Sequence, residues 1–162
     1  MISIQKINPM ELMDNKPDHI GFALVKITTE QFATIENNLE KEEGEVEIKM
    51  NFRFAADNEK RLIGVFASFI FESQKNPFII IEAGCHFTII PEAWEKMMDA
   101  EANKLTVPKD FLQHLVVLTV GTTRGILHAK TENTKFNKYH LPTLNVLDII
   151  KEDSVFEFEK NA

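Results

Sequence analysis

Residues 45–54 alternate strictly between polar and apolar side chains, and this alternation limits the possible folds more than any other feature. Successive side chains of a strand point to opposite faces, so a period of two predicts a β-strand with one face against a core and one in water. The apolar positions are Val46, Ile48, Met50, Phe52 and Phe54. The chain is therefore built around a sheet.

Three further segments extend this sheet. Residues 22–28 are a plausible first strand, and residues 62–71 are apolar on both faces, as expected of a central strand. Residues 78–90 form a fourth strand, with Gly84 as a candidate bulge. The connections among the last three strands are short, which predicts an antiparallel meander.

Helices are predicted after the strands. Residues 92–102 favour a short helix after Pro91, and apolar residues at steps of three and four predict a long helix from about 108 to 131. Residues 145–152 form a short last helix, and the tail 156–162 is expected to fray or to add an edge strand. The predicted fold is α+β, one domain over residues 1–162, with a four-stranded antiparallel sheet followed by a long helix and a short C-terminal helix.

Charge and cysteine usage exclude several classes of function. Eighteen basic and 25 acidic residues leave a net charge of −7, which disfavours nucleic acid and favours basic partners. The one cysteine forbids an internal disulfide and suits a reducing compartment. Residues 1–18 lack the pattern of a signal peptide, and no apolar run is long enough to span a bilayer. We expect a soluble, cytoplasmic protein without membrane insertion.

No residue pattern predicts catalysis. The five histidines lack metal-ligand spacing, so neither a metal nor another cofactor is expected. Cys85 and His86 resemble a nucleophile with its base, but neighbouring strand residues point to opposite faces. The glycines at 121 and 125 do not have the spacing of a phosphate-binding loop. We expect a protein that is not an enzyme.

Aromatic residues are the remaining signal. The chain has 13 phenylalanines, and the strand at 62–71 carries Phe66 and Ile70 on one face and Phe69 and Phe71 on the other. The chain's own helices can cover one face. The second face is expected to meet a partner subunit or a client polypeptide, and the alternative is a fully internal core.

The order of these elements resembles the SecB family of bacterial export chaperones over residues 45–150. An acidic residue, Glu82, precedes the phenylalanine at 87 in the fourth strand, and the long helix follows Pro108 and contains Arg124. Phe136 comes twelve residues after Arg124, and Leu141-Pro142 and Asn145 follow it. Each of these residues is common, so the resemblance depends on their combined order.

The resemblance implies a dimer of dimers that holds unfolded or aggregation-prone chains in apolar grooves without ATP or metal. Some members deliver clients to the SecA motor, and others shield antitoxins. The hypothetical client groove uses Phe54, Phe71, Phe78, Phe136 and Tyr139. Structural or interface roles are expected for Gly121, Arg124, Gly125, Leu141, Pro142 and Asn145.

Two departures and two alternatives remain open. The C-terminal FEFEKNA differs from the tail that export members present to SecA, and residues 132–138 lack the Gly-Phe-Pro of those members. A hot-dog thioesterase or dehydratase also combines a sheet with a long helix, but that helix comes early in the chain. The second alternative is an oligomeric interaction protein with one fixed partner.

Overall fold

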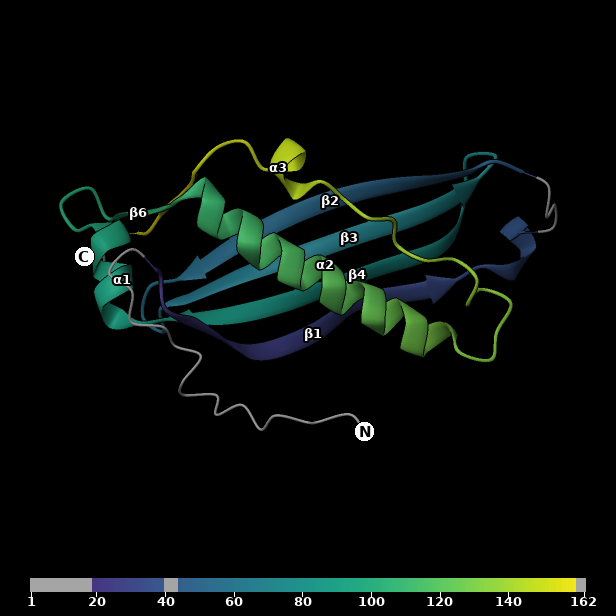
Figure 1. Ribbon diagram of the computed structural model, residues 1–162, viewed down its shortest axis with the longest axis horizontal. Coiled ribbons are helices and arrows are strands. Elements are labelled where there is room, and N and C mark those ends of the chain that lie inside the picture. Colours follow the sequence, from purple (N-terminus) through teal and green to yellow (C-terminus); the bar gives the residue numbers. More distant parts are fainter. Residues whose placement is uncertain (1–18, 40–43, 160–162) are drawn as a thin grey trace, which may run out of the picture.

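The computed structural model describes residues 19–39 and 44–159, and its main feature is an antiparallel sheet with one long helix across it (Figure 1). The sheet has four strands in the order β1-β4-β3-β2. The strands are β1 (Phe22–Thr34), β2 (Val46–Asp57), β3 (Leu62–Ser73) and β4 (Asn76–Ile89). The α+β class and the meander of β2, β3 and β4 are confirmed, with β3 in the interior of the sheet as its sequence predicted.

The helices differ from the prediction mainly in length. They are η1 (Glu36–Leu39), α1 (Pro91–Met97), α2 (Lys109–Thr131) and α3 (Val146–Ile149). The long helix is confirmed, but the predicted helices at 92–102 and 145–152 are both too long. Helix α1 stops early because the Asp99 carboxylate accepts hydrogen bonds from the backbone N–H groups of Glu101 and Ala102, both at 3.1 Å, which favours a turn.

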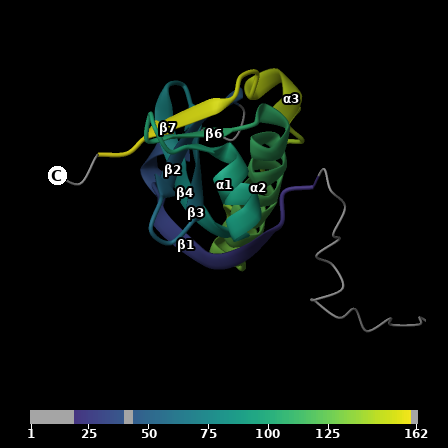
Figure 2. The ribbon, with the colours of Figure 1, turned by 90° about the vertical axis from the view of Figure 1, so that its left-hand side faces the viewer.

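A second, smaller sheet was not predicted. It has three strands in the order β5-β6-β7. They are β5 (Met98–Asp99), β6 (Lys104–Val107) and β7 (Ser154–Glu157). The tail therefore adds an edge strand, one of its two predicted states, and Figure 2 shows β7 crossing the end of the main sheet beside β6. Residues 1–18, where no signal peptide is predicted, and 160–162 at the end of the tail lie outside the described residues.

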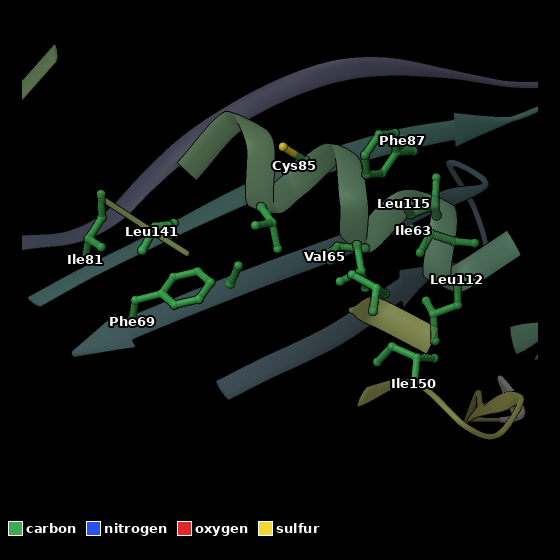
Figure 3. Packing of buried hydrophobic residues seen from close by; sticks show 14 of the residues in the cluster. Ile63, Val65, Phe69, Ile81, Cys85, Phe87, Leu112, Leu115, Leu141 and Ile150 are labelled. Atoms are coloured by element: carbon green, nitrogen blue, oxygen red, sulfur yellow. The ribbon is translucent and has the colours of Figure 1, made fainter. Parts of the chain in front are cut away.

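The core lies between α2 and one face of the sheet. Leu112 and Leu115 of α2 point at Ile63 and Val65 of β3, and all four are nearly or completely buried (Figure 3). Threonines on the buried face of α2 donate their hydroxyls to carbonyls one turn earlier, at 2.7–2.8 Å. This bonding satisfies the polar groups that the helix carries into the core. The other fully buried large side chains are Phe69, Phe71, Phe78, Phe87, Ile79, Ile81, Leu105 and Leu127.

The opposite face, called here the open face, is not the apolar surface that was predicted. Strand β3 does place Phe66 and Ile70 there, but the neighbouring strands add ion pairs across it. Lys49 pairs with Glu72 at 2.9 Å and Arg53 with Glu82 at 2.7 Å. The guanidinium of Arg53 lies 4.0 Å from the centre of the Phe66 ring, which is only 8% exposed. Side chains of the open face are therefore largely paired with one another within the chain.

Gly84 supports this arrangement by close approach, not by a bulge. The strand β4 pairs regularly with both neighbours at Gly84, and the register shifts of the β1–β4 pair lie at Leu24/Lys26 and Thr29/Gln31. A Cβ at position 84 would come within 2.8 Å of the Phe66 ring. The prediction of a bulge at Gly84 is thus wrong, and the glycine makes room for the aromatic ring on the next strand.

Candidate functional site

Three of the five predicted client-binding residues form one aromatic cluster. Phe71 of β3, Phe78 of β4 and Tyr139, from the segment after α2, contact one another edge to face. The shortest distance between ring centres is 4.8 Å, from Phe78 to Tyr139. Phe71 and Phe78 are buried and Tyr139 is half-buried, so Tyr139 covers the two phenylalanines.

The other two predicted residues lie elsewhere. Phe136 is 2% exposed within the hydrophobic core, and no ring contact joins it to the cluster among the described residues. Phe54 is half-buried on β2 and pairs with Val65. The five positions are therefore not a continuous exposed groove. Residues 132–145, called here the return segment, cover part of the aromatic surface that the prediction assigned to a client.

Arg124 holds the return segment against α2. Its Nε donates to the carbonyl of Leu141 at 3.3 Å, and its Nη2 donates to the carbonyl of Pro142 at 3.0 Å. Leu141 is buried, whereas Pro142 is exposed. Asn145 donates its side-chain amide to Asp148 at 2.6 Å, within the turn that becomes α3. Arg124 is thus linked to two other predicted structural positions, Leu141 and Pro142, through their backbone carbonyls.

The two helix glycines face away from the chain. A Cβ on Gly121 or Gly125 would meet no atom within 4 Å, so neither makes a close approach inside the subunit. They continue an exposed stripe whose larger members are Val117 and Leu118, at 52% and 38% exposure. No charged residue occurs between Asp110 and Arg124 of α2. An uncharged exposed helix face is typical of a surface that meets another protein.

Exposed apolar residues of β1 lie beside this stripe. Leu24 and Ile27 are 45% and 50% exposed. They pair with Phe87 and Cys85, whose side chains are buried under α2, so Leu24 and Ile27 point to the same side of the sheet as the helix. Figure 1 shows α2 crossing the sheet diagonally, with the C-terminal end of the helix over β1. We call Leu24, Ile27, Val117, Leu118, Gly121 and Gly125 the β1–α2 surface.

Two ring contacts fix how β1 and α2 run relative to each other. Phe22 meets Phe111 at 5.4 Å, and Lys130 lies 5.8 Å from the ring centre of Phe32. Along the chain, the exposed residues of both elements fall between these two contacts, on the helix side of the sheet. This surface was missed from the sequence, although the apolar stripe at 117–125 of the predicted helix was a usable signal.

The residues that could support nucleophilic chemistry are separated. Cys85 is buried on the α2 side, whereas His86 pairs with Gly64 and Lys26 on the open face, as strand alternation predicted. Burial lowers the pKa of His86, and the charge of Lys26 lowers it further while Glu30 opposes the shift. No cluster of metal-ligating side chains occurs within residues 19–39 and 44–159.

No helix in the described part of the chain is long and apolar enough to cross a membrane. No protein-family model matches this sequence. A search of the curated proteins finds no match either.

Proposed function

We propose that this chain is a SecB-like, ATP-independent holdase, which works in the cytoplasm as a homotetramer and binds unfolded or aggregation-prone polypeptides. The observation that carries the proposed assembly is the β1–α2 surface, where half-exposed aliphatic side chains of an edge strand and a helix lie on the same side of the sheet. Such a surface loses free energy when another subunit covers it, at about 25 cal/mol per Å² of apolar area. The order of the strands and helices, which resembles that of the SecB family, favours the same function.

We propose different residues for the contacts between subunits and for client binding. We assign the β1–α2 surface to contacts between subunits, because the glycines at 121 and 125 leave room for a second helix to approach closely. We assign client binding to the aromatic cluster and the exposed part of β2, where Phe54 and Tyr139 are accessible. Phe71, Phe78 and Phe136 become available to a client only when the return segment lifts.

Light scattering tests the holdase activity. A chemically denatured client protein is diluted into buffer with and without an excess of this chain, in the absence of nucleotide. The proposal expects the chain to suppress aggregation. Scattering that is unchanged at a several-fold excess of this chain would exclude holdase activity. A substitution at Phe136 would be a poor probe because that side chain is in the core, so Tyr139→Asp is the better variant.

Native mass tests the assembly. The wild type is expected at four times 18.6 kDa. Val117→Asp places a charge in the proposed contact and is expected to yield dimers or monomers. Glu132→Gln, an exposed change near the end of α2, is the matched control and leaves the mass unchanged. A wild-type monomer at high concentration would refute the tetramer.

The alternatives remain distinguishable. In the hot-dog arrangement the long helix comes early, whereas α2 follows all four strands of the main sheet, so we prefer the holdase. Hydrolysis of a panel of acyl thioesters would reverse that preference. Capture from lysate separates a holdase, with many bound proteins, from an interaction protein with one fixed partner. Delivery to SecA is tested by direct binding of purified SecA to the client-loaded chain.

A further inference from the structure

The strand β2 offers a more regular backbone edge than β1, the other edge strand of the main sheet. Its twelve residues pair with β3 over their whole length without a register shift. The opposite edge, β1, has two such shifts. Among residues 19–39 and 44–159, no turn or loop makes a backbone hydrogen bond to β2. A long, regular edge strand with unpaired N–H and C=O groups is a template on which another strand can add.

The strand β2 lacks the usual features that prevent such an addition. The strand has no proline, and its two cations lean inward across the sheet instead of off the edge. Lys49 reaches Glu72 on β3 and Arg53 reaches Glu82 on β4. Natural edge strands are commonly protected by bulges, prolines or outward lysines. Strand β1 has two register shifts of this kind, whereas β2 has none.

The two faces of β2 would select different side chains on an added strand. On the open face, the side chains of Lys49 and Arg53 are 64% and 56% exposed, while their partners Glu72 and Glu82 are only 9% and 21% exposed. Along residues 48–54 the accessible charge beside the edge is therefore positive, with the acidic side chains of Glu47 and Asp57 near its two ends. On the α2 side, Met50 is 40% exposed and Phe52 half-buried, so the accessible surface there is apolar.

The chain already contains one strand pair with this chemistry. In the small sheet, Glu157 of β7 lies opposite Lys104 of β6, and their charged atoms are 2.7 Å apart. The next pair along joins Phe156 to Leu105. The strand β7 belongs to a segment of alternating apolar and acidic residues, and it sits against a strand that presents a cation on one face and a leucine on the other.

We propose that the free edge of β2 binds an extended client segment as an added strand, and that it prefers segments in which apolar residues alternate with aspartate or glutamate. This inference rests on the proposed holdase function and names the class of segment that the holdase takes. The preference runs against the net charge of −7. Exposed charges beyond about 10 Å are largely screened at physiological salt, so Lys49 and Arg53 dominate along the middle of the edge.

Fluorescence anisotropy with labelled synthetic peptides tests the proposal on the full chain. The probe alternates valine or phenylalanine with glutamate, and a matched probe has lysine in place of glutamate. The glutamate probe is expected to bind at least about tenfold more tightly at physiological ionic strength, where the distant acidic residues are screened. Equal binding of the two probes would overturn the charge preference.

N-methylated probes test the backbone pairing. In a strand, the N–H groups of alternate residues point to the same edge, so only one of the two alternating sets meets β2. N-methylation of that set is expected to weaken binding roughly thirtyfold to a hundredfold, as the loss of two or three net hydrogen bonds implies, and methylation of the other set leaves it unchanged. Equal affinity of both methylated probes would overturn strand addition. Continued suppression of aggregation in that case would leave the holdase function standing.

Two protein variants locate the bound peptide. Arg53→Gln is expected to reduce the preference for glutamate severalfold, whereas Lys104→Gln leaves it unchanged. The reverse result would mean that the probe displaces β7 from β6, and it would refute the assignment to β2. The melting temperature of each variant confirms that it is folded. A peptide that dissociates wild-type oligomers on binding would show that a second copy occupies the edge, which also overturns the proposal.

Discussion

Replacing Arg124 with alanine should loosen the return segment without disturbing the sheet. The substitution removes hydrogen bonds of 3.3 Å and 3.0 Å to the carbonyls of Leu141 and Pro142. Hydrogen bonds from a charged donor contribute about 1.5–3 kcal/mol each when buried. One of these is only partly buried and the other is exposed, so we expect a combined loss of about 2 kcal/mol. For a domain of this size that corresponds to a melting temperature about 4–8 °C lower.

Thermal unfolding and amide hydrogen exchange together check this prediction. Exchange should accelerate in residues 132–145 and stay unchanged in β3 and β4, because the arginine contacts only the segment after the helix. Arg124→Lys is the matched control. It keeps the charge but lacks the two-pronged donor geometry, so it should recover at most about half of the loss. A melting temperature within about 1 °C of wild type, with unchanged exchange, would refute the role assigned to the arginine.

The same substitution should affect client binding in the opposite direction. If Phe71 and Phe78 are reached by lifting the return segment, a loss of about 2 kcal/mol raises the lifted population about thirtyfold. Arg124→Ala should then be less stable and yet suppress aggregation better at temperatures where it is folded. Weaker suppression in parallel with lower stability would indicate that clients do not reach the aromatic cluster in this way.

Two further predictions concern the open face. Phe66→Ala should lower the free energy of unfolding by about 3 kcal/mol in urea titrations, because the ring is 8% exposed between Gly84 and Arg53; a loss below about 1 kcal/mol would mean that the ring is not well packed. Burial and Lys26 hold the pKa of His86 below its ordinary 6.5, so the folded state resists protonation and the unfolded chain binds more protons. The stability contribution of His86 is therefore complete above about pH 6.5 and is lost as the pH falls through the lowered pKa. His86→Gln should reduce this acid dependence, and an identical pH profile in wild type and variant would contradict the assignment.

The predictable parts of the fold are those fixed by local pattern. The alternation at 45–54 located β2 and its wet face, and the three- and four-residue steps located α2, because each pattern reports a single element against a single core. The small sheet could not be found this way. Its pairing joins Lys104 to Glu157, which are far apart in the sequence, and each strand has only two to four residues.

The candidate site was harder to predict because exposure depends on what other segments cover. Phe71, Phe78 and Phe136 have the composition of a binding groove, but Tyr139 and the rest of the return segment fold back over this region. The sequence pattern did not predict that Leu24 and Ile27 form a surface, because they lie in an ordinary strand. They are exposed because β1 lies at the edge of the sheet. Hydrophobicity predicted which residues leave water, but the order of the strands determined which of them remain accessible.

The distribution of charge also bears on how the proposed tetramer would assemble. Two subunits stacked through their open faces would bury the Lys49–Glu72 and Arg53–Glu82 pairs, whose cations are more than half exposed in the single chain. Removing such cations from water costs several kcal/mol per ion unless new partners replace the solvent. The β1–α2 surface carries no charged residue, so covering it has no comparable cost. Subunits are therefore expected to meet on the helix side of the sheet, which leaves the open face in water and the edge of β2 accessible to a client.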